Sequence, residues 1–357
     1  MKILLLGEYS GFYKNLKEGL LDLGHEVTLL ANGDGWKQIE GADGSLYKVV
    51  KNPVSKIKEH IIAPLYNIEK YNGYDIVQMV STNIFNQYVN DSVIKKIIKN
   101  NDKVFFSAAG DDYAYYSATY NNTYRYSPLK GEEHLEKKYD RKSVRSKIIV
   151  NKENYLYRIV NGIIPITYDY AIAHKNDKNL KITIPLPLNC NNIEYSDNEV
   201  HNKIVFFHGL NRENFKGTSF IKQALNIVKE KYPKDVEIII DGRMPLKKYL
   251  SIMQKSNVII DQCKSYSWGV NALYALAQGK IVMSGCEQET LNHFGLKTCP
   301  IINITPNVED IVKKLEDVIE NRKDIQIKGK ESRLFVESFH NHKRIAQMYI
   351  DCWKNSK

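Results

Sequence analysis

The chain has 357 residues, 43% of them hydrophobic and 26% charged, which is the composition of a globular protein. This length exceeds the usual size of one hydrophobic core and predicts two domains. No stretch approaches the roughly 20 apolar residues that span a bilayer, and the N-terminal apolar run is too short for a signal peptide, so we expect a cytoplasmic protein. The five cysteines are scattered without a C-x-x-C pair or a Cys/His cluster, which supports neither a disulfide framework nor a metal site.

The net charge of +10 raises the local concentration of anionic partners such as nucleic acid, nucleotides or anionic lipid. The basic residues are dispersed, and the tightest cluster, from Lys137 to Arg145, lies among acidic residues. That cluster is better interpreted as a solvated helix face, so no nucleic-acid partner is expected. The dispersed excess is equally compatible with a peripheral contact at the inner face of the cell membrane and with a protein that touches no membrane.

Apolar runs bounded by turn residues alternate with helical patterns along the chain, which is typical of parallel βα units. In the first half the pattern predicts a helix between Phe12 and Gly24, closed by Gly24 as its C-cap. The strands predicted there span residues 2–6, 26–31, 76–79, 103–107 and 162–167.

The same alternation returns in the second half, after a proline-containing and then polar linker over residues 185–202. It predicts strands at 203–207, 237–241, 258–261, 281–283 and 300–302, with helices near 219–232, 246–255, 269–278 and 308–321. Within the first half, a Tyr- and Asn-rich loop at 113–126 could stack on a sugar ring, but we interpret its tyrosines as compositional filler.

Ligands of doubly wound sheets bind at the carboxyl ends of the strands, so the residues that follow each predicted strand are candidates for a site. Gly7 and Gly11 open the first helix but lack the G-x-G-x-x-G fingerprint, which disfavours NAD and leaves a simple tight turn as an open alternative. Asp111 and Asp112 follow Gly110 at the end of the fourth strand. They suit a base or a hydroxyl acceptor, and equally an Asx turn or a helix N-cap.

Two segments of the second half could bind a diphosphate. Arg212 and Lys216, four residues apart before a predicted helix, match its dispersed negative charge, although two solvent-exposed cations are as good an interpretation. The turn from Gly269 to Asn271 opens another predicted helix, whose first N–H groups attract anions. Taken alone, an ordinary βα turn there is the better interpretation.

Together these segments resemble retaining, family-4-type nucleotide-sugar glycosyltransferases of GT-B architecture, as found in bacterial capsule and O-antigen lipopolysaccharide synthesis. The segments 208–212 and 215–218 are similar to the family's Arg/Lys diphosphate-binding loop, and 245–251, 258–262 and 268–279 follow in the family's order. The resemblance implies two Rossmann-like α/β domains that face each other across a cleft. The acceptor-side domain would span 1–190 and the nucleotide-sugar-binding domain 200–335, with a C-terminal helix over 336–357 that packs back on the first domain.

The resemblance further implies transfer of a sugar from a nucleotide diphosphate-sugar donor to a glycan or lipid-linked glycan acceptor, without a cofactor or metal. Asp112, with Asp111 beside it, would contact the sugar or the acceptor, while Arg212 and Lys216 would stabilise the leaving diphosphate. The donor-binding positions that it implies are Gly11, Gly209, Arg212, Lys216, Gly217, Arg243, Leu246, Gln262, Tyr266, Gly269, Val270, Asn271 and Tyr274.

One departure concerns two positions, eight residues apart, where the family carries glutamates and this chain has Tyr266 and Tyr274. A neutral tyrosine cannot accept two hydroxyls as a carboxylate does; Gln262, Glu287 and Glu289 are candidates to compensate. Two alternatives therefore stay open. One is a catalytically silent sugar-nucleotide or glycan-binding protein, and the other is a sugar-nucleotide epimerase that uses Asp111, Asp112 and His208 as acid and base.

Overall fold

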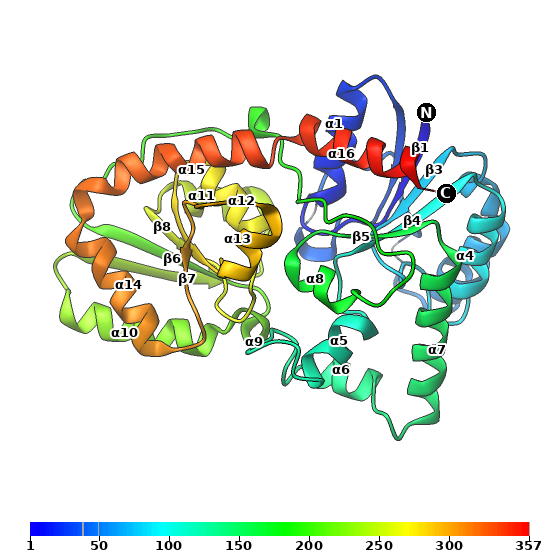
Figure 1. Cartoon of the computed structure of the whole chain (residues 1–357), viewed down its shortest axis with the longest axis horizontal. Helices are drawn as coiled ribbons and strands as arrows, with labels where there is room; N and C mark the ends of the chain where they lie inside the picture. The colour runs from blue at the N-terminus through cyan, green and yellow to red at the C-terminus, as the bar shows by residue number, and fades with distance from the viewer. Residues whose placement is uncertain (38, 49, 357) are drawn as a thin grey trace. The chain divides into compact units, whose positions relative to one another are not determined.

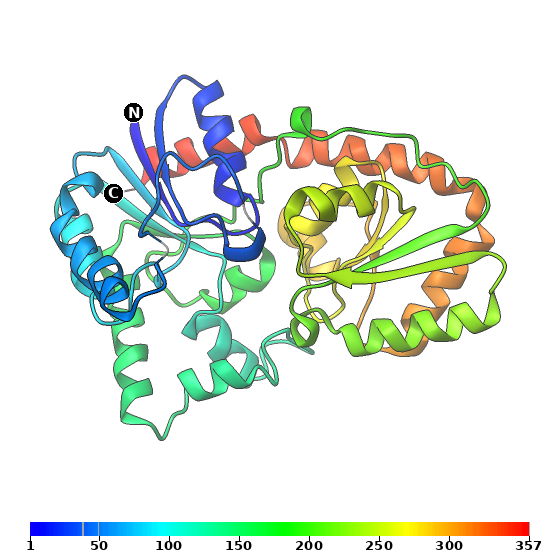
Figure 2. The same ribbon diagram turned by 180° about the vertical axis from the view of Figure 1, so that it is seen from behind.

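The computed structural model describes residues 1–37, 39–48 and 50–356, and the chain divides into two compact units (Figures 1 and 2). Unit 1 is built from three stretches of the chain, Met1–Ser117, His134–Pro187 and His342–Lys357. Unit 2 is built from two stretches, Ala118–Glu133 and Leu188–Asn341. Neither unit is therefore one continuous piece of sequence.

Unit 1 holds a five-stranded parallel sheet in the order β2-β1-β3-β4-β5. Its strands lie within two residues of the predicted ranges because most of their positions are apolar and buried, as parallel strands covered on both faces require; Thr28 and Gln78 are polar positions inside β2 and β3. The strands are β1 (Lys2–Leu6), β2 (Glu26–Leu30), β3 (Ile76–Met79), β4 (Lys103–Ala108) and β5 (Gly162–Pro165).

Helices cover both faces of this sheet (Figure 1). The predicted first helix is α1, which ends at Asp22 and is followed by Gly24 in the left-handed region, with φ of +80°. The longer helices of unit 1 are α1 (Phe12–Asp22), α4 (Asn90–Lys99), α7 (Val144–Ile159) and α16 (His342–Asn355). The shorter ones are α2 (Pro53–Ile57), a π-helical turn (Lys58–Ile62), α3 (Ala63–Tyr66), α6 (Glu133–Lys138) and α8 (Tyr168–Ala173), with α5 (Tyr113–Tyr120) where the chain leaves the unit and 3-10 turns at Gly35–Lys37 and Ile68–Tyr71.

Helix α16 returns to unit 1 and packs against α1, which confirms the C-terminal helix implied by the resemblance. Gly19 makes the close approach possible, because a Cβ at that position would lie 2.3 Å from the His342 carbonyl oxygen. The Trp353 side chain is fully buried, and its indole N–H donates to Gln78 Oε1 at 3.0 Å. A polar group inside the sheet is thus satisfied from the far end of the chain.

Unit 2 repeats the arrangement with the order β10-β9-β8-β6-β7, again all parallel. Counted from its own first strand, each sheet has the order 2-1-3-4-5. The strands are β6 (Ile204–Leu210), β7 (Val236–Gly242), β8 (Val258–Ile260), β9 (Ile281–Ser284) and β10 (Ile302–Asn303). We predicted the first of them to end at Phe207, which is wrong, because His208 continues the strand and pairs with Ile240 and Ile260 on either side.

The helices of unit 2 follow the predicted positions to within a residue or two at 218–231, 246–254, 270–277 and 308–320. They are α9 (Glu213–Lys216), α10 (Thr218–Lys231), α11 (Leu246–Gln254), α12 (Val270–Ala277), α13 (Gln288–Phe294), α14 (Val308–Glu320) and α15 (Ile325–Phe339), with 3-10 turns at Cys190–Asn192 and Arg322–Asp324. Among the described residues, no helix combines the length and the apolar composition needed to cross a membrane.

Candidate functional site

The strand order identifies where each sheet can receive a ligand. In unit 2 the chain leaves β6 toward β7 on one side and later returns to β8 on the other, so β6 and β8 form the topological switch point. The loops that follow these strands, residues 211–217 and 261–269, therefore flank the ligand-binding edge of this sheet.

Lys216 is the central charge at this edge. Its side chain is only 6% exposed, and its ammonium group lies 2.8 Å from Asp261 Oδ1, directly after β8. Burial alone would lower the pKa of Lys216, but the Asp261 carboxylate outweighs burial and holds that pKa above its usual value. The lysine is therefore charged, and the backbone carbonyl of its residue accepts the Cys263 N–H at 2.9 Å, which ties the two loops together.

The start of α12 lies beside this ion pair. A Cβ on Gly269, the N-cap of α12, would lie 4.0 Å from Asp261 Oδ2, and Val270 and Asn271 in the first turn are half-exposed. Within residues 1–37, 39–48 and 50–356, two buried oxygens at strand ends have no hydrogen-bond partner: Asn211 Oδ1 after β6 and Ser284 Oγ at the end of β9. A buried cation, a helix N-terminus and unsatisfied acceptors together fit an anionic, hydroxyl-bearing ligand.

His208 does not have the properties of an acid or base. Its imidazole is fully buried, with Nδ1 2.8 Å from the Ile260 carbonyl oxygen and Nε2 2.9 Å from Thr218 Oγ1. Burial and the nearby Lys216 charge lower its pKa to about 4, so the ring is neutral near pH 7. Nδ1 donates to the carbonyl and Nε2 accepts from the threonine hydroxyl, which fixes both nitrogens in structural bonds.

Gly209, near the end of β6, and Gly217, in the loop that follows it, each have a physical reason to be glycine. A Cβ on Gly209 would lie 2.3 Å from Tyr249 Oη, so the tyrosine hydroxyl occupies the space of a side chain. Gly217 has φ of +75°, and a Cβ there would lie 2.4 Å from Cys263 Sγ. Gly209 thus lets α11 pack closely against β6, and Gly217 lets the loops after β6 and β8 approach each other.

The other predicted donor-binding residues lie at or near the same edge, in different degrees of exposure. Arg212 is exposed, with its guanidinium 3.9 Å from the Phe215 ring centroid, and Gln262 is buried and donates to the Ser267 carbonyl at 3.0 Å. Arg243 is exposed and left-handed, with φ of +55°, directly after β7, and Leu246 begins α11. Tyr274 is buried within α12.

Tyr266 is covered by the stretch of chain from Ala118 to Glu133, here called the tyrosine segment, which belongs to unit 2. The Arg125 backbone N–H donates to Tyr266 Oη at 2.8 Å, and the Arg125 guanidinium stacks over the Tyr266 ring at 4.8 Å. The Tyr124 and Tyr126 rings lie 5.8 and 5.1 Å from that ring. Our interpretation of these tyrosines as filler is wrong, because they form an aromatic cluster.

The same segment binds the two glutamates that were candidates to compensate for the tyrosines. The Arg125 guanidinium forms ion pairs with Glu287, at 2.7 Å, and with Glu289, and Tyr126 Oη donates to Glu287. Both glutamates follow β9 in the chain, and the Glu287 N–H donates to the Tyr266 carbonyl at 2.9 Å. Their carboxylates, however, bind the tyrosine segment.

In unit 1 the corresponding switch point lies between β1 and β3, and a carboxylate already fills it. Gly11 is left-handed, with φ of +91°, and caps α1, but its N–H donates to Glu8 Oε1 at 2.9 Å and the Lys14 N–H donates to Glu8 Oε2 at 2.8 Å. Burial raises the pKa of Glu8 to about 7. The backbone N–H of Gly11, a position that the resemblance implies for donor binding, thus binds the internal carboxyl group of Glu8.

Asp112 lies at the centre of a buried polar network in unit 1. Oδ2 accepts from the Tyr157 hydroxyl at 2.7 Å and contacts His174 Nε2 at 3.0 Å, while Oδ1 accepts the Tyr115 N–H at 2.9 Å. Nδ1 of His174 lies 2.7 Å from Asp177. Burial alone would lower the pKa of His174. The carboxylates of Asp112 and, to a smaller extent, Asp177 outweigh the effect of burial and raise this pKa to about 9. The histidine is therefore an imidazolium.

Asp111 is less enclosed than Asp112, and its carbonyl accepts a hydrogen bond from the Tyr139 hydroxyl at 3.2 Å. Asp112 and its network were only partly foreseeable, because His174 is 62 positions away in the sequence. No group of three or more His, Cys, Asp or Glu side chains suited to a metal ion occurs in the described part of the chain.

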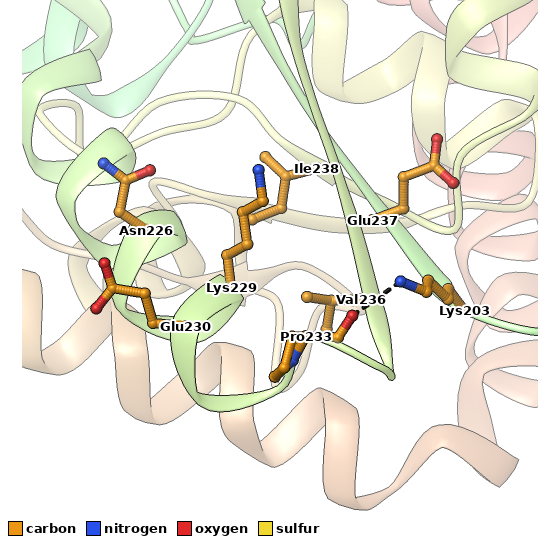
Figure 3. Close-up of a pocket in the computed structure, with 8 residues that line it drawn as sticks. All are labelled: Lys203, Asn226, Lys229, Glu230, Pro233, Val236, Glu237 and Ile238. Carbon is orange, nitrogen blue, oxygen red and sulfur yellow. Dashed lines mark hydrogen bonds between the residues drawn. The ribbon is translucent and has the colours of Figure 1, made fainter.

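A separate hollow of about 730 Å³ lies at the opposite edge of the unit 2 sheet, where β7 begins (Figure 3). It is lined in part by Lys229 and Glu237, and Lys203 Nζ bonds to the Pro233 carbonyl at 2.8 Å at its rim. Because it opens at the amino ends of the strands, it is not where a doubly wound sheet binds its ligand.

No protein-family model and no curated protein sequence matches the chain, but solved structures match almost its whole length. Sucrose-phosphate synthase from Thermosynechococcus elongatus has a TM-score of 0.62 at 12% identity, covering 99% of this chain and 98% of that one. HepE from Anabaena, in complex with UDP-glucose, has a TM-score of 0.63 at 13% identity, covering 98% of each chain.

A third structure, a putative UDP-N-acetylglucosamine 2-epimerase from Listeria monocytogenes, has a TM-score of 0.54 at 12% identity and covers 98% of this chain and 95% of that one. These likenesses confirm the predicted fold class. The chain has two parallel α/β units of the GT-B type, and at the level of the fold it is like glycosyltransferases.

Proposed function

We propose that the chain is a glycosyltransferase that takes a sugar from a nucleoside diphosphate-sugar and transfers it to an acceptor hydroxyl. The observation that carries the proposal is the burial of charged Lys216 at the switch point of unit 2, beside the start of α12. A buried cation costs free energy unless it is paired, and a diphosphate is a fitting second partner. The UDP-glucose complex of HepE supports this donor class.

In this proposal the diphosphate lies over the loops after β6 and β8. As the bond between sugar and phosphate breaks, negative charge grows on the diphosphate, and Lys216, Arg212 and the first N–H groups of α12 stabilise it. Asp261 holds Lys216 when no phosphate is bound. These positive groups supply the charge that a divalent metal supplies elsewhere, so we propose a metal-independent reaction.

Three finer points rest on the resemblance of the sequence motifs and are part of the proposal. The first is membership of the family-4 type with retention of configuration, and the second is a glycan or lipid-linked glycan acceptor in cell-surface polysaccharide synthesis. The third is contact of Asp112 with the sugar or the acceptor. The buried, ionised state of Asp112 is compatible with that contact, because a carboxylate accepts hydroxyl hydrogen bonds.

The test is ligand-dependent thermal stability against a panel of nucleoside diphosphates and nucleotide-sugars, because ligands that bind the native state raise the melting temperature by mass action. We expect the melting temperature to rise with nucleotides of one base. Lys216→Ala should abolish this rise, whereas Lys222→Ala, which replaces an exposed side chain of α10, should retain it. Since Lys216→Ala leaves Asp261 buried and unpaired, the double variant Lys216→Met/Asp261→Asn provides a folded, uncharged control. No shift with any nucleotide contradicts the proposal.

The epimerase stays a second candidate because of the likeness to the Listeria structure. Incubation of a donor that binds, with and without a mixture of acceptors, distinguishes the two. An epimerase converts the donor without an acceptor, whereas a transferase releases nucleoside diphosphate and forms a glycosidic product only with one. Binding without any turnover indicates the catalytically silent protein.

A further inference from the structure

Helix α7 of unit 1 carries apolar side chains on the face turned away from the core. Val144, Ile148 and Tyr155 are 72%, 51% and 46% exposed. At 3.6 residues per turn these three positions fall within about 40° of one another around the helix axis. The buried residues Ser146, Glu153 and Tyr157 lie on the opposite side of the same helix. Helix α7 therefore buries a mixed polar and aromatic side and exposes an apolar stripe on the other side.

Cations border this exposed stripe on both sides. Arg145 and Lys152 lie along one edge of it, and Lys147 and Arg158 along the other, by the same helical geometry. The only acidic residue of the helix, Glu153, is buried and paired with Lys138 at 2.9 Å. The exposed surface of α7 thus presents positive charge and apolar groups without a carboxylate of its own.

The charged groups that neighbouring elements turn toward α7 do not remove this excess. Asp91 at the start of α4 pairs with Lys152 at 3.0 Å, and Lys95 of α4 lies 4.5 Å from the Tyr155 ring centroid. Arg145 bonds to Gln87 at 2.8 Å. One anion and one cation from α4 therefore leave the net positive charge of the surface unchanged.

A groove deepens this surface where α7 meets the chain before α4 and the start of α4 itself. It has a volume of about 410 Å³, and its lining includes Tyr88, Val144 and Ile148 together with Arg145. Tyr88 is 74% exposed. Apolar groups, an amphipathic aromatic ring and cations thus share one surface, here called the α7 surface.

We propose that the α7 surface binds an anionic phospholipid bilayer, with the apolar stripe in the interfacial region and the four cations of α7 at the lipid headgroups. Long cationic side chains beside an apolar stripe can reach the phosphates while the stripe is buried. Each Lys or Arg near an anionic surface adds to the attraction, which salt screens. A solvated helix has no need of the stripe, and the charge favours lipid over a neutral partner. This proposal does not depend on the proposed reaction.

Co-sedimentation with vesicles tests it, using the whole chain without nucleotide. We expect binding to vesicles of equal parts phosphatidylglycerol and phosphatidylcholine, weaker binding as salt rises, and no binding to phosphatidylcholine alone. Val144→Ser/Ile148→Ser is expected to lower the partition coefficient at least tenfold, because two side chains no longer enter the interface. The matched control is Ile327→Ser/Leu334→Ser, an equally exposed apolar pair on α15.

A second pair of variants tests the charge. Lys147→Glu/Arg158→Glu is expected to abolish binding at physiological salt, whereas Lys229→Glu/Lys234→Glu, which changes the net charge equally in unit 2, is expected to bind like the parent chain. All four variants replace exposed side chains, and unchanged melting temperatures confirm that each is folded.

Three results overturn the proposal. The first is the absence of binding to the anionic vesicles at low salt, and the second is equal binding by the α7 variants and their controls. The third is self-association of the parent chain, measured by light scattering after size exclusion, that is lost in the α7 variants while no vesicle binding occurs. In that case the surface is an interface between copies of the chain.

Discussion

The ion pair of Asp112 and His174 gives the sharpest quantitative prediction. Asp112→Asn removes the charge that keeps His174 protonated while the ring stays fully buried. We expect the pKa of His174 to fall from about 9 to near or below its ordinary value of 6.5. This fall in pKa, by about 2.5, corresponds to a loss of about 3 kcal/mol of interaction, within the range for breaking one partner of a buried pair.

The pH dependence has a definite sign. The raised pKa of His174 means that its contribution to stability is complete below pH 6.5 and is lost as the pH rises through about 9. Asp112, whose pKa is lowered, contributes above its ordinary value of 3.8, and that contribution is lost as the pH falls through its folded value. The parent chain should therefore exceed Asp112→Asn in stability by about 3 kcal/mol near pH 6, and by much less above pH 10.

The pKa is measured by NMR of histidine-labelled protein, with His174→Gln to assign the signal, and the stability by urea denaturation at each pH. Asp177→Asn is the control, because that carboxylate is 35% exposed and should shift the same ring less. An unchanged pKa of His174 in Asp112→Asn, or a stability difference that is constant with pH, refutes the reasoning.

Three further predictions concern packing. Trp353→Ala leaves a cavity and deprives Gln78 of its donor, and should destabilise unit 1 by about 4 kcal/mol in thermal unfolding, with a smaller loss for Trp353→Phe. Gly209→Ala should cost about 2 kcal/mol in the parent chain and clearly less in a Tyr249→Ala background, where the clashing ring is absent; an equal cost in both backgrounds means the clash is not with that ring. Arg125→Ala should accelerate chymotrypsin cleavage within the tyrosine segment, and a rate equal to that of Arg141→Ala contradicts its anchoring role.

The strands and most helices of unit 2 were predictable because their signals are local. A buried parallel strand is an uninterrupted apolar run, and Gly24 or Gly279 marks a helix end by its left-handed backbone. The site was predictable only as a position in the topology. That Lys216 is buried against Asp261 depends on a pairing across 45 residues, which no local pattern contains.

The tyrosine segment shows where local reasoning fails most clearly. Its tyrosines have no periodicity because they pack against a single ring, Tyr266, rather than along a helix or strand face. The apolar stripe on α7 was missed for a different reason. The exposed side of this helix carries apolar residues while its buried side includes Ser146 and Glu153, so the helix lacks the usual contrast between an apolar buried side and a polar exposed side.

The interleaving of the two units has a consequence for the order in which the protein can mature. A nascent chain emerges N-terminus first, so all five strands of the first sheet are made long before the helix that buries Trp353 against them. Until then Gln78 lacks its indole donor and the face of α1 that receives α16 is exposed to water. The second sheet is translated in that interval. We therefore expect unit 1 to stay incompletely packed and accessible to chaperones until the C-terminal helix has been translated. Expression of either half of the chain alone is expected to yield fragments that aggregate.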